Sequence, residues 1–422
     1  MIVLFFVALV LAAHLYLWHR MVRSATRPGR VRKALTWGLV GLVLLVVAAF
    51  AGTRMELGNW LAWPGYLWVA LMFYLVVFLL VLEVPRAVAS VLIRRGERRP
   101  VAVEEPVPVM ASPAPVVAAV SATPAEASPA PVVAAVSAPP AAGPPMSRRL
   151  FLGRTTAVVA GAGALGTVGY GVTSALGDPV LEPVRVRLPK LDPRLNGLRF
   201  AVVSDIHLGP LTGIGHTERI VRMINGLRPD VVAIVGDLVD GSVAQLGALA
   251  RPLKSLESRY GAYFVTGNHE YYTQNGPREW VEELDQLGVR SLRNERVEIR
   301  HQGAVLDLAG VNDLNGEATG DGPDFGKALG GRTPGRSTVL LAHQPVQVEQ
   351  AAGYGVDLQL SGHTHGGQIA PFNLVVGLQQ PVVSGLATVD GVQVYVTRGA
   401  GFWGPPVRVG APPEITMLEL RS

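Results

Sequence analysis

The chain shows two different patterns of apolar and polar residues. Before residue 100, unbroken apolar runs occupy 2–18, 34–52 and roughly 61–84. Each run is apolar on every face and has about the 17 to 25 residues that cross a bilayer as a helix. Beyond about residue 185, short apolar runs alternate with Gly, Asp, Asn and His, which is typical of a sheet-containing domain. The pattern predicts three transmembrane helices and a separate globular domain.

Two unusual segments connect these regions. Residues 100–146 are rich in Pro, Ala and Val and contain ASPAPVVAAVSA twice, which predicts an extended linker without a packed core. SRRLFLGR, at 147–154, precedes an apolar Gly/Ala-rich stretch and predicts a fourth membrane helix. Its paired arginines resemble a twin-arginine export signal, although such signals normally lie at the extreme N-terminus. The expected parts are 1–99, 100–146, 147–176 and 177–422.

Charge predicts how the chain is oriented. Residues 1–176 carry 15 Lys and Arg against 6 Asp and Glu, whereas the remainder carries 22 against 26. Positive loops are retained in the cytoplasm, so residues 20–33 and the stretch after 85 are expected inside. This predicts a multi-pass protein of the cytoplasmic membrane with its globular domain outside. A mildly acidic domain argues against nucleic acid as a partner. Because the chain has no cysteine, disulfides and thiolate metal sites are excluded.

Five polar clusters follow five apolar runs of the globular region. The runs LRFAVVS, VVAIVG, YFVTG, TVLLAH and VDLQLSG are expected strands, and ligands gather where such strands end. Any one cluster has an ordinary explanation as a surface loop or a satisfied core polar group, but five together favour one shared site. The clusters are SDIH, GDLVD, GNHE, AHQP and GHTH, with Asp205, His207, Asp237, Asp240, Asn268, His269, Glu270, His343, His363 and His365.

The donor types indicate a metal centre. Carboxylate, amide oxygen and imidazole without thiolate suit Mn, Fe, Zn or Co, and we favour Mn. There are too many donors for one ion, whereas two divalent ions sharing a carboxylate would use them and match two-metal attack on a phosphate ester. Asp237 is the natural shared carboxylate, and Asp240 is expected to brace the loop or a histidine. His216 and His301 lie outside every cluster and are expected to be structural.

The order of these motifs resembles the calcineurin-like metallophosphoesterase superfamily over roughly residues 195–420. GHTHGGQ, Tyr271 and the C-terminal PPEITMLEL further resemble its membrane-anchored or exported bacterial subgroup typified by YkuE and YaeI. The resemblance implies an α/β four-layer sandwich, two mixed β-sheets flanked by helices, here preceded by an α-helical transmembrane region.

The resemblance also implies roles for the site residues. Asp205, His207 and His365 would hold one ion, Asn268, His343 and His363 the other, and Asp237 both. A hydroxide between the ions would attack phosphorus, and His269 would steady a phosphoryl oxygen or protonate the leaving group. Apart from the resemblance, we expect Glu270 to orient His269. The expected activity is a dinuclear-metal phosphodiesterase or phosphomonoesterase.

Two other functions stay open. One is a pyrophosphatase acting on a lipid-linked or sugar-nucleotide lipid substrate, and the other is a non-catalytic metal-binding envelope protein. If the site faces outward, a lipid or cell-envelope phosphoester is the more plausible substrate. An apolar wall would suit such a substrate, although the same side chains are equally consistent with a plain core. The wall would consist of Tyr271, Tyr272, Phe372, Phe402 and Trp403.

Overall fold

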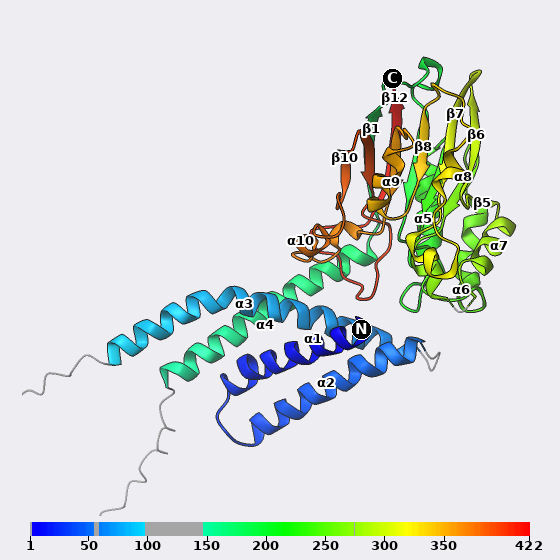
Figure 1. Cartoon of the computed structure of the whole chain (residues 1–422). Coiled ribbons are helices and arrows are strands. Elements are labelled where there is room, and N and C mark those ends of the chain that lie inside the picture. The colour runs from blue at the N-terminus through cyan, green and yellow to red at the C-terminus, as the bar shows by residue number, and fades with distance from the viewer. Residues whose placement is uncertain (1, 55–58, 98–146, 274) are drawn as a thin grey trace, which may run out of the picture.

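The chain folds into a helical arm joined to a domain of two β-sheets (Figure 1). The computed structural model describes residues 2–54, 59–97, 147–273 and 275–422. The predicted Pro/Ala/Val-rich linker, 100–146, therefore lies outside the described residues.

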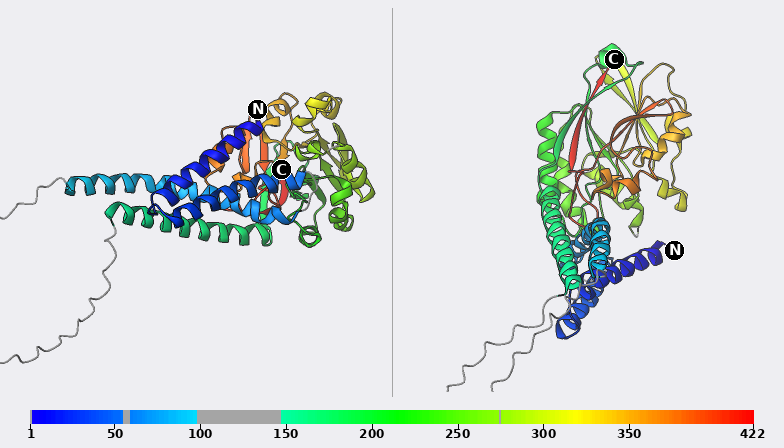
Figure 2. Two further views of the ribbon diagram at one scale, coloured as in Figure 1. Left: turned by 90° about the horizontal axis from the view of Figure 1, so that it is seen from below. Right: turned by 90° about the vertical axis from the view of Figure 1, so that its left-hand side faces the viewer.

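In the described part of the chain, four helices pack together to form the arm, and consecutive helices run in opposite directions (Figures 1 and 2). Their inward apolar side chains, such as Leu17, Val46, Leu79 and Ala164, share one buried cluster. Many others, such as Leu44, point outward and are exposed. The helices are α1 (Ile2–Leu17), α2 (Arg30–Arg54), α3 (Ala62–Glu97) and α4 (Arg148–Leu176).

Three of the described helices are long and apolar enough to cross a membrane. They cover Arg30–Thr53, Ala62–Ile93 and Arg148–Leu176. The first predicted span differs, because α1 has only 16 residues and passes at Trp18–Arg23 into a π-helical turn that carries two arginines. The 16 residues of α1 are slightly fewer than the roughly 17 that a helix needs to span a bilayer.

Each sheet has six strands and contains both parallel and antiparallel pairs. The first sheet has the order β1-β12-β2-β3-β4-β5, and the second has the order β10-β11-β9-β8-β7-β6. The strands are β1 (Val180–Arg187), β2 (Arg199–Val203), β3 (Val231–Val235), β4 (Ala262–Val265), β5 (Val289–Ser291), β6 (Glu295–His301), β7 (Ala304–Gly310), β8 (Thr338–Leu341), β9 (Leu358–Ser361), β10 (Gly385–Val389), β11 (Val392–Val396) and β12 (Glu414–Arg421).

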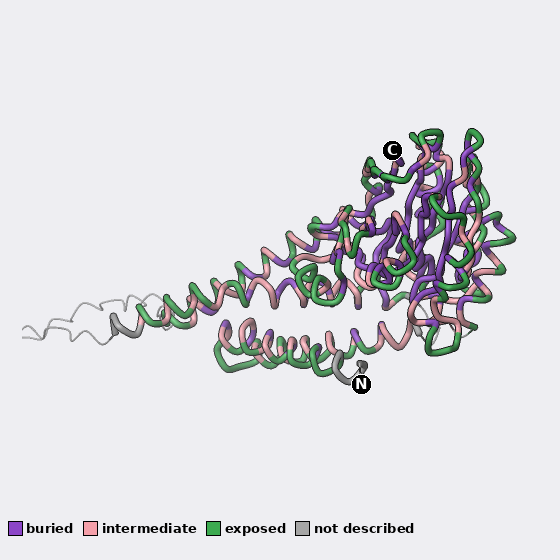
Figure 3. Tube along the Cα trace, turned by 45° about the horizontal axis from the view of Figure 1, so that its top comes forward, coloured by how far each residue is buried: buried purple, intermediate pink, exposed green. Residues whose placement is uncertain are grey.

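Alternation along the strands produces the layers. In β3, Val231, Ala233 and Val235 pack between the sheets, whereas Val232 and Ile234 pack against helices on the outer face. Helices α5 (Ile214–Leu227), α6 (Val243–Ala250) and α7 (Arg278–Gln286) cover the first sheet. Helices α8 (Phe325–Leu329) and α9 (Val348–Ala352) cover the second. Burial is concentrated in the strands (Figure 3), and the predicted four-layer α/β sandwich is confirmed.

The parallel strands align their carboxyl ends. Pairing of Val203 with Ile234 and of Val235 with Val265 brings the ends of β2, β3 and β4 together. In the second sheet, β8 and β9 are likewise parallel neighbours. The five polar clusters of the sequence directly follow these five strands.

Candidate metal centre

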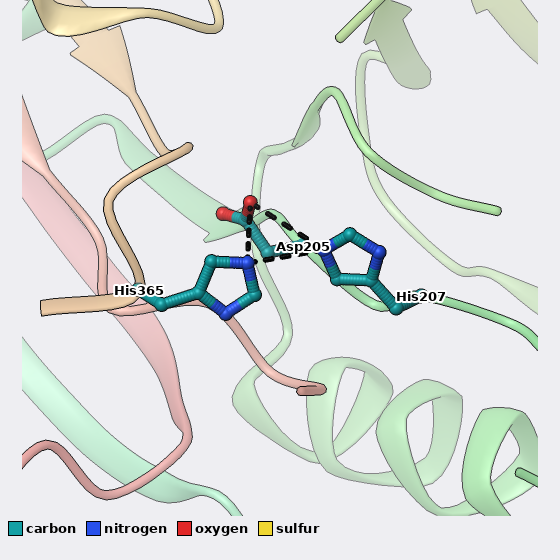
Figure 4. Close-up of side chains that lie close together, drawn as sticks. All are labelled: Asp205, His207 and His365. Carbon is teal, nitrogen blue, oxygen red and sulfur yellow. Dashed lines mark hydrogen bonds and ion pairs between the residues drawn. The ribbon is translucent and has the colours of Figure 1, made fainter. Parts of the chain in front are cut away.

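Asp205, His207 and His365 come together from both sheets. The first two follow β2, and His365 follows β9. Nε2 of His365 lies 3.0 Å from Nε2 of His207 and 3.3 Å from Oδ1 of Asp205. Figure 4 shows the carboxylate and the two rings facing a common point. All three side chains are buried and close enough together to hold one metal ion.

A second group forms around His343. Its Nε2 lies 3.2 Å from Oδ2 of Asp237 and 3.2 Å from Oδ1 of Asn268. Nδ1 of His363 lies 2.9 Å from the same Asn268 oxygen. Asp237, His343 and His363 also have the mutual distances of a metal site.

Asp237 connects the two groups. Its Oδ2 atom, which faces His343, also lies 3.8 Å from Nε2 of His207. His269 joins from β4, with its Nε2 3.9 Å from the same oxygen. His207, Asp237 and His269 form a third possible ligand group. The structure thus gathers all seven expected ligands and His269 in one place.

The hydrogen bonds of the rings show that the centre suits cations. Nδ1 of His343 faces the carbonyl oxygen of Val235 at 2.8 Å, so it carries a proton. Burial opposes protonation, but Asp237 holds the pKa of His343 well above its usual range, so Nε2 also carries a proton, which points toward the oxygens of Asp237 and Asn268. A metal ion bound at this point would displace that proton. The imidazole nitrogen and the carboxylate and amide oxygens are donor types that suit a divalent transition metal.

The surroundings of Asp205 and Asp237 shift the pKa values of these two carboxyl groups in opposite directions. Burial raises the pKa of Asp205 even though His343 opposes the shift. Burial would also raise the pKa of Asp237, but His343 and His269 outweigh it and hold that pKa well below its usual range. Burial, together with nearby His343, lowers the pKa of His363 to about 3. At neutral pH Asp237 is therefore an ionised carboxylate, and His363 is a neutral imidazole that can donate a lone pair to a metal ion.

Asp240 braces two rings at once. One of its oxygens, Oδ1, accepts hydrogen bonds from Nδ1 of His207 at 2.8 Å and from Nδ1 of His269 at 2.7 Å. Burial lowers the pKa of His269, but Asp237 and Asp240 reverse the shift and raise it to about 9. Because Nδ1 of each ring is held by Asp240, Nε2 of each ring faces the centre.

Glu270 does not orient His269 as the sequence suggested. Its carboxylate instead accepts hydrogen bonds from the backbone amides of Asp237, Leu238 and Gly267. A buried carboxylate satisfied by three amides holds the loop that carries Asp237. The expectation is wrong because adjacency in the sequence does not place the Glu270 carboxylate against the His269 ring, which Asp240 holds instead.

The backbone is strained where the expected ligands lie. Five of the seven expected ligands have left-handed φ angles between 49° and 70°: Asp205, His207, Asp237, His363 and His365. Such angles are uncommon outside glycine and cluster at functional sites. Two glycines make room for the ligands, because a Cβ on Gly267 would overlap the Asp237 carboxylate and one on Gly362 would overlap Ser204.

Arg408 is a site residue that the sequence did not reveal. Its fully buried guanidinium donates to the carbonyl oxygens of His365, Arg398 and Gly401 and lies 3.1 Å from Nδ1 of His365. Burial lowers its pKa to about 10, so it remains charged at neutral pH. It therefore fixes the loop that carries His365. Its signal was a lone charge inside the otherwise uncharged stretch PPVRVGAPP.

Two aromatic side chains of the expected wall flank the centre. The rings of Tyr272 and Trp403 lie 5.0 Å and 6.0 Å from that of His269, and both residues are exposed. Tyr271 instead hydrogen-bonds Asp321, and Phe402 is buried. His216 and His301 lie outside the three ligand groups, and His301 contacts the hydroxyl of Tyr260.

Comparison with known proteins identifies the class. The family described as Calcineurin-like phosphoesterase matches residues 198–367. A protein named "Uncharacterized metallophosphoesterase" from Aquifex aeolicus is 33% identical, over 57% of this chain and 92% of that protein. The chain belongs to the calcineurin-like phosphoesterase family.

Two further relatives bear on the subgroup. YkuE of Bacillus subtilis, an "Uncharacterized metallophosphoesterase", is 29% identical over 66% of this chain and 98% of that protein. A "Transmembrane protein with metallophosphoesterase domain" from Danio rerio is 41% identical over 60% of each chain, so this chain spans about three fifths of that relative's length. The predicted resemblance to the superfamily and its YkuE-like members is confirmed.

Proposed function

We propose that the chain is a membrane-anchored, dinuclear-metal phosphohydrolase acting on phosphodiesters or phosphomonoesters. The observation that carries this proposal is the position of Asp237, whose Oδ2 faces His207 of one ligand group and His343 of the other. A carboxylate placed in this way can be shared by two ions, which is the arrangement used for attack on phosphate esters.

Seven side chains would hold the ions. Asp205, His207 and His365 form one set, Asn268, His343 and His363 the other, and Asp237 belongs to both. When bound, divalent ions stabilise charge on phosphoryl oxygens and lower the pKa of water. Imidazole, carboxylate and amide donors suit Mn, Fe, Zn or Co, and Mn is our first choice.

His269 is proposed as the proton donor. Asp240 fixes its Nδ1, so the proton available for transfer is on Nε2, which faces the centre. Burial lowers the pKa of His269, but Asp237 and Asp240 raise it to about 9, and the hydrogen bond to Asp240 favours the protonated ring. The ring can donate the Nε2 proton to a leaving-group oxygen or hydrogen-bond a phosphoryl oxygen. Tyr272 and Trp403 flank the ring.

The arm is proposed to anchor the domain outside the cytoplasmic membrane. The lengths and compositions of α2, α3 and α4 support crossing, and the positively charged loop 20–33 supports this orientation. The zebrafish relative is also named a transmembrane protein. The paired arginines at the start of α4 support export by a twin-arginine route, which we include in this proposal.

The test uses the full chain in nanodiscs, loaded with Mn²⁺. We expect hydrolysis of bis(p-nitrophenyl) phosphate or p-nitrophenyl phosphate that His269→Ala greatly reduces. His301→Ala is the matched control, since it removes a histidine outside the centre. Turnover of diphosphates alone would favour the pyrophosphatase. Metal binding without turnover of any phosphoester would favour the non-catalytic envelope protein.

A further inference from the structure

An exposed apolar segment lies on the domain beside the helical arm. It comprises residues 372–378, which include α10 (Asn373–Val376), and we call it the α10 patch. Phe372, Leu374, Val375 and Leu378 are 44%, 71%, 49% and 84% exposed. Residues 366–389 also contain no Asp, Glu, Lys or Arg. Contiguous apolar surface without charge marks a site of interaction with an apolar partner.

The patch continues an apolar contact between the domain and the arm. Ile369, three residues before Phe372, packs with Val407 and Val409 against the buried cluster of the helices. The amide of Arg408 donates to the carbonyl oxygen of Gly171 in α4 at 2.9 Å. Figures 1 and 2 show α10 on the side of the domain that faces the arm. The patch is therefore held close to the helices that are proposed to cross the membrane.

Aromatic residues of the arm indicate the level of the bilayer surface. Trp60 and Trp63 are exposed where α3 begins, at the end of the arm near the domain. Trp and Tyr are enriched at membrane–water interfaces. A Cβ on Gly404 would lie 3.9 Å from the ring of Tyr66, so loop 402–409 reaches the same level.

The same loops connect this level to the metal centre. Trp403, beside Gly404, has its ring 6.0 Å from that of His269. Its backbone amide and carbonyl are both bonded to the side chain of Gln368, three residues after His365. One continuous stretch thus runs from the ligand His365 through Gln368 and Ile369 to the α10 patch.

We propose that the α10 patch inserts into the surface of the lipid bilayer, so that the metal centre opens at the level of the lipid headgroups. A phosphoester carried by a membrane lipid would then reach the centre without leaving the bilayer. The partner is a lipid surface because the patch adjoins the apolar contact that Ile369 makes with the proposed membrane helices, and because residues 366–389 lack charge. The substrate class rests on the proposed function, whereas insertion does not.

Labelling of single cysteines tests insertion. The chain has no native cysteine, so Leu374→Cys and Leu378→Cys can be labelled with the fluorophore NBD without background. Arg300→Cys is the control, because Arg300 is 72% exposed near the β6–β7 turn, at the opposite end of the parallel strands. The labelled full chain is reconstituted in phosphatidylcholine–phosphatidylglycerol vesicles containing doxyl-labelled lipid.

Insertion predicts that doxyl lipid quenches the label at 374 and 378 but not at 300. Labels at 374 and 378 that remain as unquenched as the label at 300 would overturn the proposal. Energy transfer between labelled chains without doxyl quenching would also overturn it, because the patch would then bind a second copy of this chain.

The second arm of the experiment tests the substrate. In Leu374→Glu/Leu378→Glu, turnover of a vesicle phospholipid should fall while that of soluble bis(p-nitrophenyl) phosphate is kept. Leu374→Ala/Leu378→Ala is the milder control. Equal loss on both substrates would overturn the lipid part of the proposal. If the wild-type chain hydrolyses neither substrate, the proposed function fails, and the fluorescence result still decides insertion.

Discussion

The helical arm and the two-sheet domain depart from the pattern of a water-soluble protein in opposite directions. In the arm, apolar side chains such as Leu44 and Leu80 face outward. In the domain, charged and polar side chains such as Asp205, Asp237 and His343 are buried together. Each departure is costly in water and is stable only when a partner covers it. The comparison indicates lipid around the arm and cations within the domain.

The largest expected effect comes from removing the carboxylate that joins the two ligand groups. Asp237→Asn should reduce turnover to background and lower the metal content, because it removes the negative charge placed between both groups. Metal content is measured by plasma mass spectrometry. Asp390→Asn is the control, since Asp390 lies exposed in the β10–β11 turn and asparagine tolerates its left-handed φ. Unaltered activity of Asp237→Asn would refute the shared role.

Removing the proposed proton donor should leave the metal in place. His269→Ala is expected to lower kcat by about 10² to 10⁴, the usual contribution of general acid–base catalysis. Metal content should stay close to the wild-type value, because His269 is proposed to lie beside the ions and not to bind them. Loss of metal in this variant would show that His269 is a ligand, as its distance from Asp237 permits.

A charge on the outer face of the arm tests the other side of the comparison. Leu44→Arg should disfavour insertion of α2 by about 3 kcal/mol, as expected for arginine near the centre of a membrane helix. Insertion is measured by glycosylation of an engineered acceptor site during translation with microsomes. Leu44→Ala should insert like the wild type. Equal insertion of both variants would mean that this face is not in lipid.

Crowding the metal centre should weaken it without removing a ligand. In Gly267→Ala, the new methyl group would overlap the Asp237 carboxylate. The metal affinity should fall roughly 10- to 100-fold, the usual effect of disturbing the groups that orient a ligand. Competition with a chelating dye measures this change. Gly215→Ala, with open space around its Cβ position, should bind metal normally.

The smallest expected effect concerns a buried histidine outside the centre. Burial, helped by the guanidinium of Arg219, lowers the pKa of His216 to about 4. The unfolded chain therefore binds more protons between about pH 6.5 and 4, so stability is lost as the pH falls. The loss between pH 7 and pH 5 is about 2 kcal/mol. Acidification from pH 7 to pH 5 should therefore lower the midpoint of thermal unfolding less in His216→Gln than in the wild-type protein. An identical shift in both proteins would contradict this cause.

The sequence alone allowed us to predict individual strands and the polar residues that come together at their ends. Five apolar runs predicted β2, β3, β4, β8 and β9, because buried parallel strands are continuously apolar. The polar clusters that follow them meet in space, because the ends of these strands are aligned. These inferences needed only neighbouring residues.

Long-range pairing was beyond local reasoning. Strand β12, near the C-terminus, lies between β1 and β2, and no local pattern predicts such a partner. Arg408 supports His365 across 43 residues, and Glu270 supports the Asp237 loop across more than 30. The four-layer arrangement was predicted through family resemblance and not through the strand pattern.

The most direct test of the account is electron paramagnetic resonance of the full chain titrated with Mn²⁺. If Asp237 joins two ions across the ligand groups, two equivalents should give a spin-coupled spectrum, and Asp237→Asn should lose that coupling. Two bound but uncoupled manganese ions in the wild-type protein would contradict a paired centre. A wild-type protein that binds neither manganese nor another divalent metal would contradict it as well.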